Sequence, residues 1–316
     1  MLTSRLVACT FFVAAAAAGV ACGQDYPTRA IRIITSEVGG GSDFSARIIA
    51  QEISPALGQP VIVDNRVNII SMEAVMRAPS DGYTVLLTGG NFYTTPMLEK
   101  TAFDPVRDFT PITIATESYQ ILVVHPALPV KSVRDLIALA KSRPGELNYS
   151  STGAGSSIHL ASELFNALAG VSIVHVPYKG TGAAINSILS GQVQVLFSSA
   201  GPVAPLIKAA RLRALAITSA QPSALYPDLP TIGATVPGYV SRSMTAMFAP
   251  VGTPAPIIER LNREVVRVLE RPDVKQKYLG IGLETVGGTP AELAAKMKSE
   301  IALWGKLIKQ IGIRAD

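Results

Sequence analysis

Short apolar runs and amphipathic helical patterns alternate along most of the 316-residue chain. Each run has the length of a buried strand, and the runs fall at 31–35, 61–63, 83–87, 121–124, 147–150, 173–176, 193–197 and 212–217. Helical patterns with one apolar stripe lie between or after them. Repeated strand–helix units predict an α/β fold with mostly parallel sheets and helices on both faces.

Local signals mark where several of these helices begin. Ser132 with Asp135, and Thr289 with Glu292, resemble capping boxes, and Pro254 stands at another expected helix start. The apolar stripes expected to pack on the sheets are Ala46, Ile49, Ile53, Ala56 and Leu57; Val133, Leu136, Ile137 and Ala140; Leu160, Leu164, Phe165 and Leu168; Ile257, Ile258, Leu261, Val265 and Leu269; and Leu293, Met297, Ile301 and Trp304.

The N-terminus has the pattern of a secretory signal peptide. A short basic region precedes an uncharged apolar run at 6–21, which is shorter than the roughly 20 residues of a spanning helix. Small residues around Cys22 then supply a cleavage site, so residues 1–23 are predicted to be removed on export. Both cysteines, Cys9 and Cys22, lie in this segment, which leaves the mature chain without a thiol. The alternative is acylation at Cys22, because Gly-Val-Ala-Cys loosely resembles a lipoprotein box.

Composition narrows the class of partner. Hydrophobic residues make up 48% of the chain, which excludes a disordered protein. The 28 basic and 23 acidic residues are scattered singly, with no basic run that would follow a phosphate backbone. We therefore expect no nucleic-acid partner.

Three loops share one arrangement, in which a strand ends, small residues follow and a helix begins. They lie at 39–43, 151–157 and 178–182. The first N–H groups of a helix have no partner within it, and the helix dipole adds partial positive charge there. Such loops bind carboxylate or phosphate at the carboxyl ends of the strands. The alternative for each loop is an ordinary helix cap without a ligand.

Enzymatic motifs are absent from the sequence. It contains no P-loop, no G-x-S-x-G elbow and no complete G-x-G-x-x-G. The histidines His125, His159 and His175 are too far apart for a short-spaced metal motif and are predicted to pack or cap. Asp43 is either a catalytic carboxylate or, as we prefer, part of a helix start that pairs with Arg47. We expect no enzyme activity, no cofactor and no metal.

An ordered set of motifs resembles the Bug family, the TctC-like periplasmic substrate-binding proteins of tripartite tricarboxylate transporters. The motifs are Gln24-Asp25-Tyr26-Pro27, Gly39-Gly40-Gly41-Ser42-Asp43, Leu57-Gly58-Gln59-Pro60-Val61, Asp64-Asn65-Arg66, Asp81-Gly82-Tyr83-Thr84, Asp104-Pro105 with Asp108-Phe109, Gly153 with Gly155-Ser156, His175-Val176-Pro177-Tyr178-Lys179-Gly180, Leu212-Arg213-Ala214-Leu215-Ala216, and Ala249-Pro250 with Gly252-Thr253-Pro254. Together they cover essentially the whole mature chain.

The resemblance implies a two-lobed class II periplasmic-binding-protein fold, each lobe a mostly parallel sheet flanked by helices. Lobe 1 would be residues 24–122 plus 247–316, and lobe 2 residues 123–246. It also implies a monomeric periplasmic receptor that captures a small carboxylate between the lobes and delivers it to membrane transporter subunits. Two alternatives stay open: a sensor that presents its ligand to a signalling partner, and a secreted enzyme.

The same resemblance implies a set of ligand-binding residues on the loops. They are Gly40, Gly41, Ser42, Asp43, Ser151, Thr152, Gly155, Ser156, Lys179, Gly180, Thr181 and Ser198. Ser198 stands where some family members have an acid that would pair with an ammonium group, so a plain carboxylate is favoured.

Four departures from the family pattern leave the identity of the carboxylate open. Residues 35–38, which include Glu37, replace Pro-Phe-Ala-Pro, and residues 67–71 replace Pro-Gly-Ala-Gly-Gly. Residues 244–246 replace Trp-x-Gly, and Ser198 replaces the acid. Glu37 would repel an anionic ligand unless it points to solvent or contacts a cationic or hydroxylated end.

Overall fold

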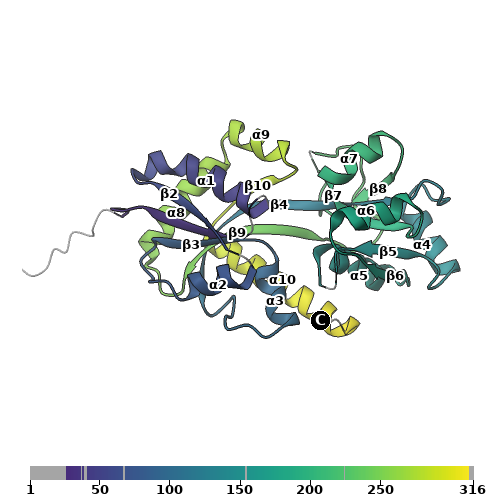
Figure 1. Cartoon of the computed structure of the whole chain (residues 1–316), viewed down its shortest axis with the longest axis horizontal. Coiled ribbons are helices and arrows are strands. Elements are labelled where there is room, and N and C mark those ends of the chain that lie inside the picture. The colour runs from purple at the N-terminus through teal and green to yellow at the C-terminus, as the bar shows by residue number, and fades with distance from the viewer. Residues whose placement is uncertain are drawn as a thin grey trace, which may run out of the picture.

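The computed structural model describes residues 26–36, 38, 41–66, 68–153, 155–223 and 225–312. These residues form two lobes joined by two long strands, β4 (Phe109–Val124) and β9 (Arg242–Pro250) (Figure 1). The α/β, two-lobed fold class is therefore as predicted. The predicted signal peptide with both cysteines, together with Glu37, Gly40 and Val67, lies outside the described residues.

The first lobe is built on a sheet in the order β2–β1–β3–β9–β4, with β10 on the other side of β4. Its further strands are β1 (Ile31–Thr35), β2 (Val61–Asn65), β3 (Thr84–Thr88) and β10 (Glu284–Gly287). Its helices are α1 (Gly41–Leu57), α2 (Asn68–Met76), α3 (Asn91–Leu98), α8 (Ala255–Leu269), α9 (Pro272–Gly280) and α10 (Pro290–Ile311).

Helices cover both faces of this first sheet. Successive side chains of a strand point to opposite faces, so neighbouring residues of one strand pack against different helices. On β1, Ile33 belongs to the core shared with α1 and α8, whereas Ile34 belongs to the core shared with α2, α3 and α10. On β3, Leu87 and Leu86 divide in the same way. The continuous apolar runs that predicted these strands thus reflect burial on two faces.

The second lobe is built on β8–β4–β7–β5–β6. Its strands are β5 (Asn148–Ser151), β6 (Val174–Pro177), β7 (Val195–Ser199) and β8 (Arg213–Ile217). Its helices are α4 (Val133–Ser142), α5 (Ser157–Ala169), α6 (Thr181–Leu189), α7 (Ala200–Lys208) and the short 3-10 turn η1 (Ile232–Ala234). Residues 109–119 of β4 pair with β9 in the first sheet, and residues 120–124 pair with β7 and β8 in the second.

Each sheet is mixed, with parallel pairing away from the crossing strands. β1 pairs in parallel with β2 and β3, and β5 with β6 and β7. The antiparallel pairs in the described part of the chain all involve β4 or β9. The sheets are less uniformly parallel than the strand–helix alternation predicted, because both crossing strands run against their neighbours.

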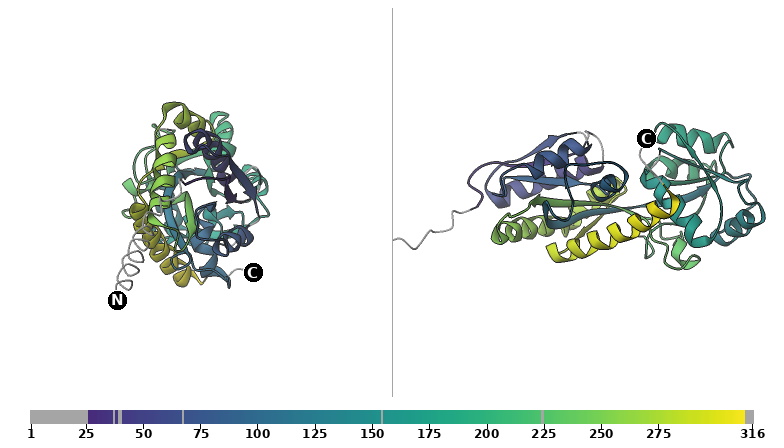
Figure 2. Two further views of the ribbon diagram at one scale, coloured as in Figure 1. Left: turned by 90° about the vertical axis from the view of Figure 1, so that its left-hand side faces the viewer. Right: turned by 90° about the horizontal axis from the view of Figure 1, so that it is seen from below.

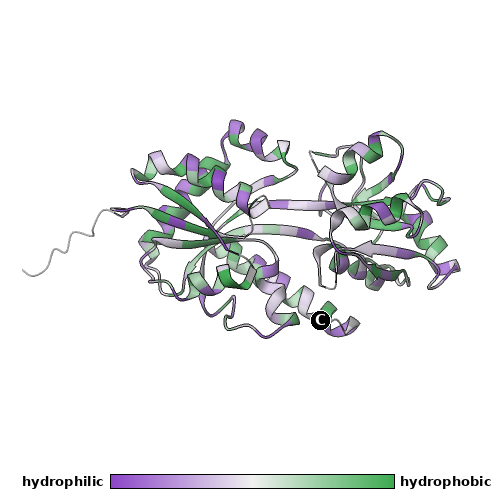
Figure 3. Cartoon of the chain, in the orientation of Figure 1, coloured by the Kyte–Doolittle hydropathy of each residue, from purple (hydrophilic) through white to green (hydrophobic). Residues whose placement is uncertain are grey.

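All eight predicted strands are present, whereas β9, β10 and the first part of β4 were not predicted. The expected capping boxes are confirmed in part: Thr289 and Glu292 form a complete box at the start of α10, and the Ser132 hydroxyl accepts the Asp135 N–H at 3.1 Å. The predicted stripes are wrong at two positions, because Ala56 of α1 is exposed and Leu168 is 45% exposed near the end of α5. Figure 3 shows apolar residues gathered within each lobe, while the stretches of β4 and β9 between the lobes are paler or hydrophilic.

The C-terminal helix α10 links the lobes. It runs from the first lobe towards the second (Figure 2) and packs against β4, α3 and α5. Leu293 and Met297 anchor its first half, and Trp304, Leu307 and Ile308 are buried along its second half. A helix that contacts both lobes is placed to influence the region between them.

Candidate functional site

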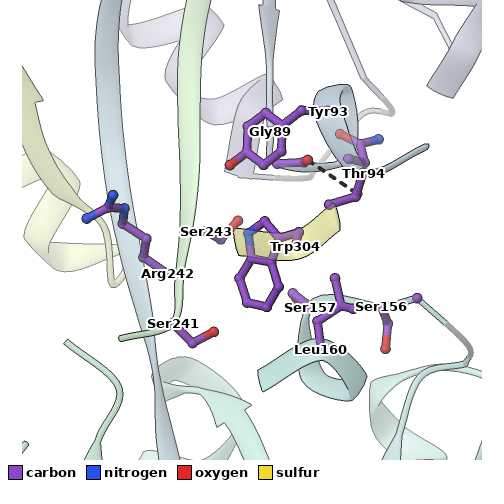
Figure 4. Close-up of a pocket in the computed structure, with 13 residues that line it drawn as sticks. Gly89, Tyr93, Thr94, Ser156, Ser157, Leu160, Ser241, Arg242, Ser243 and Trp304 are labelled. Carbon is purple, nitrogen blue, oxygen red and sulfur yellow. Dashed lines mark hydrogen bonds between the residues drawn. The ribbon is translucent and has the colours of Figure 1, made fainter. Parts of the chain in front are cut away.

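A cavity of about 280 Å³ lies between the lobes. Its lining comes from the start of α3, the start of α5, the first residues of β9 and one turn of α10 (Figure 4). The lining residues are Gly89, Gly90, Asn91, Tyr93, Thr94, Gly155, Ser156, Ser157, Leu160, Ser241, Arg242, Ser243 and Trp304. In Figure 4, Tyr93 and Thr94 of the first lobe stand opposite Ser156, Ser157 and Leu160 of the second, with Trp304 between them.

The first-lobe wall is held rigidly from behind by aromatic packing. α3 begins where two glycines end β3, and Phe92 in its first turn is fully buried. The Phe92 ring meets Phe109 edge-on, with centroids 4.9 Å apart, and Phe248 at 4.6 Å. These contacts fix the helix start, since aromatic pairs add specific geometry to apolar burial.

The second-lobe wall is the start of α5. Ser156 is the N-cap, and its hydroxyl accepts the His159 N–H at 3.2 Å. Further along the helix, Leu164 and Phe165 are buried in the core of the second lobe, and the Tyr239 hydroxyl donates to the Ala161 carbonyl at 3.0 Å. The crossing strand also reaches this helix start, because the Gln120 side-chain amide donates to the Ser157 hydroxyl at 3.3 Å.

The electrostatics of the lining suit an anion. The lining residues named above include no aspartate or glutamate, and the first turns of α3 and α5 carry no acidic side chain. The two helix starts therefore add positive potential that no lining carboxylate cancels. Hydroxyl groups of Ser156, Ser157, Ser241 and Ser243 can donate hydrogen bonds to an oxygen-rich ligand, whereas the Thr94 hydroxyl donates to the Gly90 carbonyl.

A buried charge cluster supports the wall formed by β9 and α10. Arg242 lies 2.8 Å from Glu300 and 3.6 Å from Glu117, and Lys296 donates to Glu117. Burial by itself would raise the pKa of Glu117. Hydrogen bonds from Lys296 and Tyr119 and the positive charges of Arg242 and Lys296 outweigh it and lower that pKa. Glu117 is therefore a carboxylate at neutral pH.

Two of the predicted ligand residues, Gly155 and Ser156, line this cavity. Gly41, Ser42 and Asp43 do not line it but begin the adjoining helix α1. The Ser42 hydroxyl lies 3.7 Å from the point that a Cβ on Gly89 would occupy, so the two glycine-rich helix starts of the first lobe are neighbours. Gly40 lies outside the described residues.

Asp43 is turned into the first lobe and is only 2% exposed. Its carboxylate lies 3.0 Å from the Arg47 guanidinium and accepts the Asn65 side-chain amide at 2.8 Å. The predicted pairing of Asp43 with Arg47 is confirmed.

The other predicted residues of the second lobe do not line this cavity. Ser151 is buried, and its hydroxyl lies 2.6 Å from His175 Nε2. Ser198 is fully buried at the second-lobe end of the crossing. Thr152 and Thr181 are half-buried, and Lys179 and Gly180 are exposed at the start of α6.

The sequence did not predict most of the first-lobe wall, nor the wall formed by β9 and α10. Gly89-Gly90-Asn91 follows a predicted strand and could have been found, because it repeats the strand–glycine–helix arrangement of the other loops. Arg242 carried no local signal. Trp304 was expected only as a core residue, and it does pack there while also lining the cavity.

No helix among the described residues is both long enough and apolar enough to cross a membrane.

Comparisons with known proteins agree with one another. A family model described as the tripartite tricarboxylate transporter family receptor (TctC) matches residues 45–313. BugT of Bordetella pertussis is 31% identical over 322 residues, which cover 99% of either chain. The R. palustris protein Rpa4515, solved with adipate, is 36% identical with a TM-score of 0.75, covering 92% of this chain and 99% of that one. MatC of Rhodopseudomonas palustris, solved with bound malate, is 29% identical with a TM-score of 0.71, covering 90% of this chain and all of its own. The chain therefore belongs to the TctC family of tripartite tricarboxylate transporter receptors.

Proposed function

We propose that this protein is a periplasmic receptor that captures a small organic carboxylate between its lobes and delivers it to a tripartite tricarboxylate-type membrane transporter. The observation that carries the proposal is the interlobe cavity, where two helix starts and a row of hydroxyls converge without a lining carboxylate. The adipate in Rpa4515 and the malate in MatC support the same chemical class of ligand.

Ligand capture would work by closure of the lobes. A ligand that contacts the α3 start in one lobe and the α5 start in the other binds both only when the lobes approach, so it favours the closed state. We take the moving bodies to be residues 24–122 plus 247–316 and residues 123–246. The motion would bend β4 and β9 where they pass between the sheets.

The proposed ligand residues divide by role. Gly155 and Ser156 would offer a backbone amide and a hydroxyl directly at the cavity. Gly40, Gly41 and Ser42 would add amides from the neighbouring α1 start. Ser151, Thr152, Lys179, Gly180, Thr181, Asp43 and Ser198 would shape the loops around these contacts or meet the ligand after closure.

Two experiments test the proposal at separate points. Mass spectrometry of material released from the purified protein, followed by a thermal-shift panel of mono-, di- and tricarboxylates, tests the ligand class, because a ligand specific for the folded state raises the melting temperature. Co-purification from membranes of cells that make the transporter subunits tests the partner. Recovery of a signalling protein in their place would favour the sensor alternative.

A further inference from the structure

Two histidines of the second lobe stack face to face directly behind the candidate ligand loop at 151–156. His159 comes from the first turn of α5 and His175 from the neighbouring strand β6. Their ring centroids are 4.0 Å apart and the ring planes differ by 10°. His159 is 6% exposed, and neither ring lines the cavity. The pair is therefore next to the site without being part of its surface.

Each ring holds one end of the loop through a ring nitrogen. The Gly155 N–H donates to His159 Nδ1 at 2.9 Å, and the Ser151 hydroxyl lies 2.6 Å from His175 Nε2. An imidazole Nδ1 that accepts a hydrogen bond carries no proton, so His159 is the neutral tautomer protonated on Nε2. Protonation of Nδ1 would place an N–H against the Gly155 N–H and break this contact.

The surroundings of the pair favour two neutral rings. Tyr149 of β5 stacks on His175 with centroids 5.1 Å apart, and its hydroxyl donates to Glu163 of α5 at 2.6 Å. Burial lowers the pKa of both histidines, and the nearby His175 lowers that of His159 further, to about 4. Glu163, the acid on the same helix, is already bonded to Tyr149 and contributes to neither shift.

We propose that His159 and His175 are positioning residues that hold the 151–156 loop in its ligand-binding form, and that the His159 contact does so only while the His159 ring is neutral. The inference rests on the proposed carboxylate-binding function. It adds that acidification breaks the contact of His159 with Gly155 and thereby weakens ligand binding from behind the site.

The variants distinguish a hydrogen bond from simple packing. His159→Asn keeps an acceptor close to the position of Nδ1, whereas His159→Leu fills the space without one. His175→Gln and His175→Phe make the same comparison for the Ser151 contact. His125→Asn is the matched control, because His125 Nδ1 also accepts a backbone N–H, that of Ala127 at 3.2 Å, on a loop away from the site.

The first readout needs no ligand. Hydrogen exchange of the 151–156 backbone is measured in folded variants at one pH. We expect faster exchange in His159→Leu and His175→Phe, near-native exchange in His159→Asn, and no change in His125→Asn. Equal exchange in His159→Leu and the wild type would overturn the positioning role. If His159→Leu does not fold, the test is loop exchange in His159→Asn and in the wild type, each measured at pH 7 and pH 4. The wild-type loop should open at pH 4. The loop of His159→Asn should show no change beyond that of the intrinsic exchange rate.

The second readout is affinity for adipate, malate or whichever panel carboxylate binds the wild type. We expect a loss of about tenfold in His159→Leu, as for one lost hydrogen bond of roughly 1.4 kcal/mol, and less than about threefold in His159→Asn. As pH falls from 6.5 to 4, wild-type affinity should fall more steeply than that of His159→Asn. Protonation of the ligand itself affects both proteins equally, so the difference in slope reports the His159 ring. Altered exchange with unaltered affinity would overturn the link to binding. Failure of the wild type to bind any carboxylate would refute the proposed function, while the exchange result still decides the positioning role.

Discussion

Arg242 on the crossing strand β9 lies 2.8 Å from Glu300 on the C-terminal helix. Glu300 also accepts the indole N–H of Trp304, one turn further along α10, at 2.7 Å. Lys296 and Glu117 make a second connection between α10 and the other crossing strand, β4. Through these contacts α10 fastens both strands that join the lobes, beside the cavity that Arg242 and Trp304 line.

Removal of the Glu300 charge should lower the stability of the folded chain. Glu300 is 5% and Arg242 17% exposed, so Glu300→Gln leaves a largely buried guanidinium without its nearest counter-charge. We expect a loss of about 3 kcal/mol in the free energy of unfolding, measured with urea. Glu73→Gln, which breaks the more exposed pair between Glu73 on α2 and Arg77 just after that helix, should cost about 0.5 kcal/mol or less. Similar small losses in both variants would contradict a stabilising role for the α10 contact.

The low pKa of Glu117 predicts a pH-dependent contribution to stability. A carboxyl group whose pKa is lower in the folded than in the unfolded chain stabilises the fold above its unfolded pKa, and this stabilisation is lost as the pH falls through the folded value. Lys296→Met removes one cause of the low pKa. We expect this variant to be less stable than the wild type at pH 7 and to approach it at pH 3. A stability difference that is independent of pH in urea unfolding would disprove this origin.

Gly155→Ala should disturb the approach of the lobes. A Cβ at this position would lie 2.5 Å from Leu98 of the opposite lobe, so Leu98 must move or the cavity must widen. Gly155 also has φ +72, where a side chain costs roughly 1 kcal/mol. Gly145→Ala is the matched control, because Gly145 has φ +76 with nothing within 4 Å of its Cβ position. Both variants should lose similar stability, but only Gly155→Ala should lose ligand affinity. Equal affinities would exclude the contact with Leu98 from ligand binding.

Ser156→Ala separates helix capping from ligand binding. Ser156 caps α5 and Ser132 caps α4 through the same hydroxyl-to-N–H contact, at 3.2 and 3.1 Å. Each alanine variant should cost about 1 kcal/mol of stability. Only Ser156→Ala should also weaken carboxylate binding, by roughly fivefold in thermal-shift or calorimetric titration. Unchanged binding in Ser156→Ala would leave its hydroxyl with a structural role alone.

The fold was largely predictable because most strands carry continuous apolar runs. In the strand Ile31–Thr35, Ile33 and Ile34 are buried on opposite faces although Arg32 is exposed, and the predicted bounds match those of the strand. The crossing stretches were missed because they bear polar groups such as Glu117, Tyr119 and Arg242. Their strand conformation comes from pairing between segments more than 100 residues apart, which local periodicity does not report.

The site was predictable only where one segment carries it. The loop at 151–157 could be predicted because its glycine and serine residues lie between a predicted strand and a predicted helix. The walls formed by Arg242 and Trp304 arise when β9 and α10 fold back beside that loop, and the stacking of His159 on His175 arises when β6 pairs beside β5. Such contacts between distant segments leave no trace in local spacing.

Titration calorimetry with the carboxylate panel, comparing the wild type with Ser156→Trp, tests the central claim most directly. We predict that the wild type binds one small carboxylate per chain. Ser156→Trp, whose side chain would project into the cavity, should lose that binding while its urea midpoint stays near that of Ser156→Ala. Binding of an uncharged solute in place of any carboxylate, or unchanged carboxylate affinity in Ser156→Trp, would contradict capture of an anion in the interlobe cavity.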